Sequence, residues 1–131
     1  MQDKIGWIGL GSMGNRMAKN LAKNGYQMLV TDKMDTSAAP QRAHVATTNS
    51  EVISEANILI LSIPAGPDTL EITQEILNSP SSSVEIVIDT STIGIPDAKK
   101  AAELLSKKGI EYVDAPVSGG IAGADSATLA V

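Results

Sequence analysis

With 131 residues, the chain is long enough for one domain and too short for two of ordinary size. It has no cysteine, which excludes disulfides, thiolate metal sites and thiol nucleophiles, and its net charge of -5 argues against a nucleic-acid or anionic-membrane partner. No apolar run reaches the ~20 residues of a membrane helix and the first residues have no signal-peptide character, so we expect a cytoplasmic, metal-free domain.

The first third of the chain reads as strand, helix and strand. Residues 5–10 are apolar and end in glycines, which is typical of a short buried strand. Apolar residues then recur with helical period over residues 12–24, and Gly25 supplies a left-handed stop. Residues 28–31 form the second predicted strand. The pattern is weak between residues 34 and 48, where Pro40 interrupts it, so at most a short helix and a short strand are expected there.

The middle of the chain continues the alternation. Asn49 or Ser50 can cap a brief helix that runs to residue 55. The continuous apolar run over residues 58–63 predicts a strand that is covered on both faces. A helix follows from the segment Gly66-Pro67-Asp68, and Pro80 ends it.

The last third has the same organisation. Residues 84–88 form a predicted strand, and a helix opens at Pro96 and ends at Gly109. A further strand is expected over residues 110–113, and residues 128–131 begin one more. The alternation predicts an α/β fold of Rossmann type, in which a doubly wound, mostly parallel sheet carries helices on both faces. Ligands bind such sheets at the carboxyl ends of the strands.

A glycine-rich segment, Gly9-Leu10-Gly11-Ser12-Met13-Gly14, joins the first strand to the first helix with the pattern G-x-G-x-x-G. We expect Gly9 to permit the tight turn, Gly11 to let a pyrophosphate approach the backbone, and Gly14 to allow close helix–strand packing. The backbone N–H groups and the positive helix end would then face the diphosphate. The alternative is a turn that merely joins two elements, but the strand before it and the helix after it favour the phosphate loop.

An acidic residue, Asp32, ends the second strand 18 residues beyond Gly14, close to the ~20 expected for a carboxylate that binds the adenosine ribose. Such a carboxylate repels a 2′-phosphate, which favours NAD over NADP. Lys33 offsets part of that repulsion, so NADP stays possible. The alternative for Asp32 is an ordinary turn aspartate. A P-loop NTPase is excluded because its G-x-x-x-x-G-K-[ST] motif is missing.

Four segments together closely resemble the β-hydroxyacid dehydrogenases, a family that includes 3-hydroxyisobutyrate dehydrogenase, tartronate semialdehyde reductase and, more distantly, 6-phosphogluconate dehydrogenase. They are Ile8-Gly9-Leu10-Gly11-Ser12-Met13-Gly14, Met17-Ala18-Lys19-Asn20-Leu21, Ile88-Asp89-Thr90-Ser91-Thr92-Ile93 and Tyr112-Val113-Asp114-Ala115-Pro116-Val117-Ser118-Gly119-Gly120. The match extends along the whole chain in order. The resemblance implies that Ile63 and Pro64 line the cofactor and that Thr92 lies near the nicotinamide.

The resemblance also implies that Ser118, Gly119 and Gly120 hold the substrate's carboxylate. Two glycines after a serine can turn successive N–H groups and a hydroxyl toward one point, which is a concave anion site. The alternative there is a flexible loop, and for Thr92 it is hydrogen bonding at the start of a helix. We expect Asp89 and Asp114 to end their strands structurally or to hydrogen-bond nearby backbone, and we expect the single histidine, His44, to be an exposed or edge residue.

In the family the chemistry uses a lysine within a glycine- and asparagine-containing helix motif of the following domain, and no lysine here stands in such a motif. We therefore expect residues 1–131 to be a truncated dinucleotide-binding domain without a catalytic residue, lacking the all-helical substrate and dimerisation domain. The intact enzyme would transfer a hydride between the nicotinamide and a small 3-hydroxy acid resembling 3-hydroxyisobutyrate, and it would form a homo-oligomer only through the missing domain. The alternatives are a stand-alone dinucleotide-binding sensor and a methyltransferase, which Gly14 and the serine–glycine loop disfavour.

Overall fold

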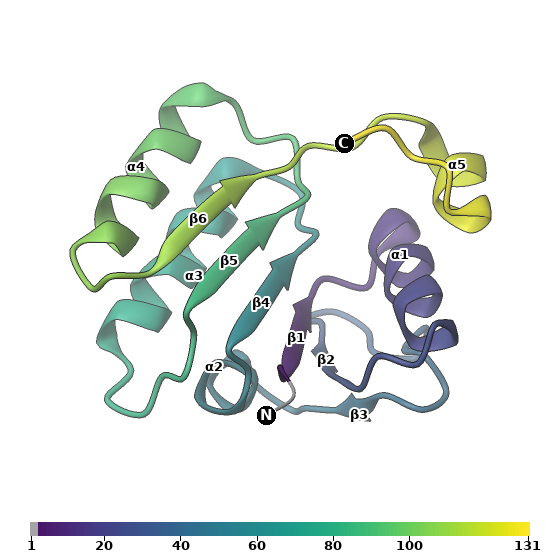
Figure 1. Cartoon of the computed structure of the whole chain (residues 1–131), viewed down its shortest axis with the longest axis horizontal. Helices are drawn as coiled ribbons and strands as arrows, with labels where there is room; N and C mark the ends of the chain where they lie inside the picture. Colours follow the sequence, from purple (N-terminus) through teal and green to yellow (C-terminus); the bar gives the residue numbers. More distant parts are fainter. Residues whose placement is uncertain (1–2) are drawn as a thin grey trace.

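The computed structural model describes residues 3–131, which form a six-stranded sheet between helical layers (Figure 1). The strands lie in the order β3-β2-β1-β4-β5-β6, and every pairing is parallel. Their bounds are β1 (Ile5–Ile8), β2 (Met28–Thr31), β3 (His44–Val45), β4 (Ile58–Leu61), β5 (Ile86–Asp89) and β6 (Glu111–Asp114). The predicted Rossmann-type α/β fold is confirmed.

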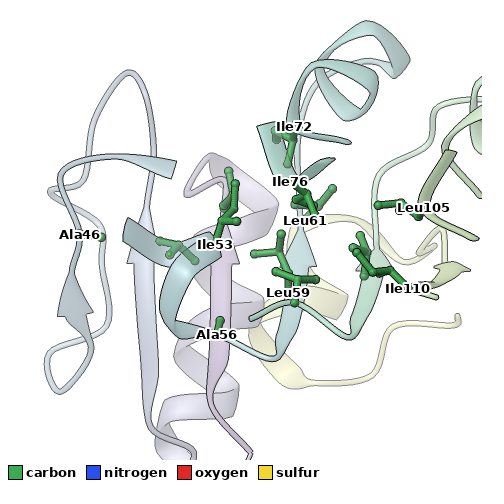
Figure 2. Close-up of a cluster of buried hydrophobic side chains, with 13 residues drawn as sticks. Ala46, Ile53, Ala56, Leu59, Leu61, Ile72, Ile76, Leu105 and Ile110 are labelled. Atoms are coloured by element: carbon green, nitrogen blue, oxygen red, sulfur yellow. The ribbon is translucent and has the colours of Figure 1, made fainter. Parts of the chain in front are cut away.

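Two hydrophobic clusters show how the helices cover the sheet. The helices are α1 (Ser12–Lys23), α2 (Asn49–Glu55), α3 (Gly66–Asn78), α4 (Ile95–Ser106) and α5 (Gly120–Ser126). Side chains of α2, α3 and α4 share the larger cluster with Ile8, Leu59 and Leu61, and Figure 2 shows several of these side chains pointing toward one another. Ala18 of α1 shares the second cluster with Trp7 and Ile60, which alternate along β1 and β4 with the strand residues of the larger cluster. Because alternate strand residues face opposite sides, α1 covers one face and α2, α3 and α4 cover the other.

The strand order reverses at β1, which lies between β2 and β4. The chain leaves β1 through α1 toward β2 and later returns through α2 to β4, on the other side of β1. In an open parallel sheet this reversal separates the loops at the carboxyl ends of the two central strands and leaves a crevice between them. The fold therefore places the glycine-rich segment after β1 at the point where such sheets bind ligands.

Between residues 34 and 48, where at most a short helix and a short strand were expected, the structure has turns and the short strand β3. In these turns Asp35 accepts hydrogen bonds from the backbone N–H and the hydroxyl of Ser37 at 2.8 and 3.0 Å. Two other local predictions are wrong. The side chain that caps α2 is Thr48, whose Oγ1 accepts a hydrogen bond from the Glu51 N–H at 3.2 Å. Cap preferences rank several polar residues almost equally, so the sequence does not select among three adjacent candidates.

The second error lies near the end of the chain, where the strand expected over residues 128–131 is an isolated antiparallel bridge between Ser118 and Ala130. Between these two residues stands α5, which the sequence analysis did not predict. Gly119 and Gly120 have φ angles of +136° and +64°, which turn the chain away from an extended course and into this helix. Figure 1 shows α5 beside α1, with the carboxyl terminus near the carboxyl ends of the strands.

Two smaller observations complete the fold. His44 lies in the edge strand β3 with 65% of its side chain exposed, as expected, and its Nε2 is 3.1 Å from Glu51 Oε1. Within residues 3–131, no helix combines the length and apolar character that crossing a membrane requires.

Candidate functional site

A cleft of about 640 Å³ opens at the carboxyl ends of β1, β2 and β4. The loops after these strands, the first turns of α1 and residues of α3 form most of its walls. The lining residues are Ile8, Gly9, Leu10, Gly11, Ser12, Met13, Gly14, Asn15, Arg16, Asp32, Lys33, Met34, Asp35, Ala38, Asn49, Ser62, Ile63, Pro64, Asp68, Glu71, Ile72 and Glu75. Ten of the eleven residues predicted to bind the cofactor are in this list, and the one outside it is Thr92. The structure therefore brings segments from three strand ends to one cavity.

The three glycines of the loop have different steric surroundings. Gly9 has a φ of +110°, and a Cβ atom there would collide with the backbone carbonyl of Ser62 on the neighbouring strand. A Cβ atom on Gly14 would collide with the carbonyl oxygen of Gly9. Gly11 differs, because a Cβ atom there would meet nothing within 4 Å. The predicted tight turn at Gly9 and close packing at Gly14 are confirmed, while Gly11 leaves open space in the cleft wall.

The first turn of α1 borders this open space. Gly11 is the N-cap residue, no side chain caps the helix, and no acidic residue stands in its first turn. Helices leave their first N–H groups without intrahelical partners, and the aligned peptide dipoles make that end positive. The arrangement can receive an anionic group such as a diphosphate.

Asp32 connects the second strand to this loop. Its Oδ2 accepts a hydrogen bond from the Leu10 N–H at 2.7 Å, and its Oδ1 accepts from the N–H groups of Met34 and Asp35 at 2.8 and 3.2 Å. The carboxylate thus braces two loops of the cleft and also supplies oxygen atoms to the cavity wall. The turn role considered in the sequence analysis is present, and the brace to Leu10 was not foreseen.

A second brace, which the sequence analysis missed, comes from Trp7. Its side chain is only 2% exposed, and its indole N–H donates a hydrogen bond of 2.7 Å to the carbonyl oxygen of Gly9. A buried indole N–H needs a hydrogen-bond acceptor, so a tryptophan within a buried strand was a signal that a carbonyl oxygen lies close to it. The hydrogen bond holds the carbonyl against which Gly14 also packs.

Charges around the cleft are mostly negative. Asp68, Glu71 and Glu75 line it from α3, opposite Asp32 and Asp35. The two cations of the lining both have acidic partners. Lys33 Nζ is 3.7 Å from Asp68 Oδ1, and Arg16 Nε is 2.9 Å from an oxygen of Asp125 on α5. The lining of the cleft therefore carries more negative than positive side chains.

The predicted substrate loop lies outside the cleft lining. Ser118, Gly119 and Gly120 are all exposed, and the Ser118 N–H donates to the Ala130 carbonyl at 2.9 Å. The bond occupies the N–H of Ser118, whereas the expected anion site uses its hydroxyl and the N–H groups of the two glycines. The helix α5, which begins at the end of this loop, is held against α1, because Asn20 of α1 donates a hydrogen bond of 2.6 Å from Nδ2 to the Ala124 carbonyl of α5.

Asp89 is fully buried at the end of β5, in the structural role expected for it. Its Oδ2 accepts hydrogen bonds from the hydroxyls of Thr69 and Tyr112 at 2.7 and 3.0 Å, and its Oδ1 accepts from the Ser91 N–H at 3.0 Å. Burial raises the pKa of the Tyr112 phenol well above its usual range, and the neighbouring Asp89 carboxylate adds to the effect.

This raised pKa predicts a loss of stability at alkaline pH. An unfolded tyrosine has a pKa of about 10, so as the pH rises above that value only the unfolded state loses the Tyr112 proton. The contribution of the protonated Tyr112 to the free energy of unfolding is therefore complete below about pH 10 and falls as the pH rises further. Urea unfolding between about pH 8 and pH 11 should show a shallower alkaline decline for Tyr112→Phe than for the unchanged chain. An identical decline in both proteins would contradict the prediction.

Comparisons with known proteins agree with this geometry. Residues 4–131 match the family described as the NAD binding domain of 6-phosphogluconate dehydrogenase. The chain is 36% identical over 138 residues to 2-(hydroxymethyl)glutarate dehydrogenase of Eubacterium barkeri, covering 98% of this chain and 44% of that protein. It is 37% identical over 131 residues to mitochondrial 3-hydroxyisobutyrate dehydrogenase of Mus musculus, covering 95% of this chain and 39% of the relative.

A solved structure of Mycobacterium tuberculosis 3-hydroxyisobutyrate dehydrogenase with L-serine superimposes with a TM-score of 0.87 at 34% identity, over 98% of this chain and 45% of that one. The chain thus spans less than half the length of the relatives that it matches. It belongs to the β-hydroxyacid dehydrogenase family, as the nicotinamide-dinucleotide-binding domain described for 6-phosphogluconate dehydrogenase.

Proposed function

We propose that the cleft binds NAD, with the pyrophosphate over the turn from Gly11 to Met13 and the adenosine ribose at Asp32. The observation that carries the proposal is the uncapped first turn of α1, which faces a cavity that Gly11 leaves open. Asp32 stands at the neighbouring strand end, as a ribose-binding carboxylate requires. Its oxygens already accept three backbone hydrogen bonds, but a carboxylate has about four acceptor positions, which leaves one for a ribose hydroxyl.

The other predicted residues take roles that follow from their positions. Leu10, Ser12, Met13 and Gly14 complete the phosphate loop, and Lys33 borders the adenosine side. Ile63 and Pro64 form the wall on the side of β4, where the nicotinamide half would lie. Thr92 lies outside the cleft lining and would act near the nicotinamide. The loop Ser118-Gly119-Gly120 would hold the substrate's carboxylate through the serine hydroxyl and the glycine N–H groups.

We further propose that these residues are the cofactor domain of a larger cytoplasmic enzyme, which transfers a hydride between bound nicotinamide and a small 3-hydroxy acid. The bound nicotinamide would supply the hydride chemistry. This chain's own contribution is to orient the dinucleotide and to hold the substrate's carboxylate. The catalytic lysine and the surface for homo-oligomer formation would lie in a further domain. The names of the relatives and the share of their length that this chain covers support the proposal.

Calorimetric titration with NAD tests the binding, and a hydride-transfer assay tests the assignment of the catalytic group. We expect the 131 residues to bind NAD and to show no turnover of short 3-hydroxy acids. An absence of NAD binding would contradict the cofactor proposal. Clear turnover by these residues alone would instead contradict the assignment of the catalytic lysine to a further domain.

Cofactor preference provides a second prediction. Asp32→Asn should weaken NAD binding about tenfold or more, because hydrogen bonds to a charged group are worth roughly 1.5–3 kcal/mol. The same change removes the charge that repels a 2′-phosphate, so the ratio of NADP to NAD affinity should rise by about tenfold. Titrations with both dinucleotides would measure the two effects.

The matched control is Asp35→Asn. Asp35 also lines the cleft, but it forms no hydrogen bond to the phosphate loop, and its own carboxylate bonds Ser37. We expect Asp35→Asn to change the ratio of NADP to NAD affinity by less than about threefold. If both variants change the ratio equally, the general acidity of the cleft decides the preference, and Asp32 has no special role.

A further inference from the structure

A chain of hydrogen bonds links the loop after β4 to the loop after β5. The Ile63 N–H donates to the Ser91 Oγ at 2.8 Å, and the Ser91 N–H donates to the Asp89 Oδ1 at 3.0 Å. Ser91 is 6% exposed and Asp89 is fully buried. Ser91 is not a lining residue of the cleft, but Ile63 is. Ser91 therefore acts on the cleft through the backbone of Ile63.

Asp89 holds Ser91 in a fixed place. Its second oxygen accepts the hydroxyl hydrogen bonds of Thr69 from α3 and Tyr112 from β6. Among residues 3–131, no cation forms an ion pair with this carboxylate, so hydrogen-bond donors alone compensate its buried charge. A buried carboxylate is stable only when such donors are well placed, which constrains the position of every group around it.

The chain of bonds leaves the wall at residues 62–64 without a free backbone donor. The Ser62 N–H donates to the Ile8 carbonyl at 2.9 Å, the Ile63 N–H is held by Ser91, and Pro64 has no N–H. Ile63 and Pro64 therefore present no free backbone N–H to the cleft that they line, and their side chains are apolar. Such a surface suits a nicotinamide ring and a ribose, and it does not suit a phosphate, which requires hydrogen-bond donors. The first turn of α1 differs, because its helix end is uncapped and its first N–H groups lack intrahelical partners.

We propose that Ser91, fixed by Asp89, is a positioning residue that shapes residues 62–64 to receive the nicotinamide riboside half of the dinucleotide. The inference rests on the proposed function and deepens it. By keeping the Ile63 N–H out of the cleft, Ser91 makes this wall complementary to one end of the dinucleotide and so helps to set the direction in which NAD lies.

The test compares NAD with ADP, which has the adenosine and both phosphates but no nicotinamide riboside. Ser91→Ala removes the acceptor of the Ile63 N–H. We expect it to weaken NAD binding by about fivefold to tenfold, while ADP affinity changes by less than about twofold. Amide hydrogen exchange followed by NMR should accelerate at Ile63 and stay unchanged at Ser62, whose N–H bonds the Ile8 carbonyl.

Thr90→Val is the matched control. The Thr90 hydroxyl donates to the Leu61 carbonyl at 2.7 Å, so this variant also deletes one hydroxyl between the ends of β4 and β5 but leaves the Ile63 N–H in place. We expect it to preserve the affinities for both ligands.

The outcomes separate the two proposals. If the unchanged chain binds both ligands and Ser91→Ala weakens NAD and ADP equally, or neither, the role of Ser91 is overturned and the NAD site stands. A loss of NAD affinity in Thr90→Val that equals the loss in Ser91→Ala would also overturn it. If the unchanged chain binds neither ligand, both proposals are overturned together.

Discussion

A Gly11→Val chain should fold and lose at least about 99% of its affinity for NAD, a hundredfold effect of about 2.7 kcal/mol. Gly11 has an ordinary φ of -67°, and a Cβ atom there meets nothing within 4 Å, so the fold has room for the side chain. The isopropyl group would instead stand over the first turn of α1, where the pyrophosphate is proposed to approach the backbone.

Calorimetric titration with NAD measures the affinity of the Gly11→Val chain, and urea unfolding measures its stability. The free energy of unfolding should fall by no more than about 1 kcal/mol, since an apolar residue is a poorer helix N-cap than glycine. Gly11→Ala should weaken binding less than the valine does, because its side chain is smaller. Affinity within about threefold of the unchanged chain would show that no diphosphate approaches this turn.

Gly9→Ala, in contrast to Gly11→Val, should damage the fold itself. We expect a loss of at least about 3 kcal/mol in the free energy of unfolding. The φ of +110° at Gly9 disfavours any side chain, and the new Cβ atom would collide with the Ser62 carbonyl on the neighbouring strand. Either β1 and β4 must separate or the turn must rebuild, and both changes disrupt the centre of the sheet. Because small domains have total stabilities of roughly 5–15 kcal/mol, the variant would be marginally folded.

Gly25→Ala separates the two causes of that loss. Gly25 also has a positive φ, +92°, but a Cβ atom there would meet nothing within 4 Å. It should therefore cost about 1–2 kcal/mol from backbone strain alone. If Gly9→Ala destabilises the chain no more than Gly25→Ala does, the close approach of β1 and β4 is not the constraint that the structure indicates.

The steric surroundings of the three glycines indicate that they meet different requirements, some of the fold and some of the binding site. Gly9 and Gly14 are needed by the fold, since each has a backbone carbonyl where its Cβ would be. Gly11 is not needed by the fold in this way, and the proposed approach of a diphosphate to its backbone would account for the glycine. A substitution series across the three positions would therefore distinguish damage to the sheet from damage to the binding site.

Much of the fold and the main part of the site could be predicted from the sequence, because they depend on patterns that are local along the chain. Hydrophobic period separates strands from helices, and the alternation of the two types specifies a parallel sheet. The pairing of a glycine loop with Asp32 depends on one β–α–β unit, whose geometry is nearly the same in all such folds. Residues 118–131 were predicted less well, since the positive φ angles of Gly119 and Gly120 decide their course.

Only the tertiary structure decided which distant groups meet. Ile63 and Ser91 are 28 residues apart, and they bond because β4 and β5 are neighbours in the sheet. Asp89 gathers donors from α3, β6 and its own loop, and Trp7 finds its acceptor where the chain turns at Gly9. A pattern along one segment does not encode such pairs, because their distances depend on strand order and helix packing. The sequence determined what kind of ligand this protein is built for, and the packing decided which residues hold the site in shape.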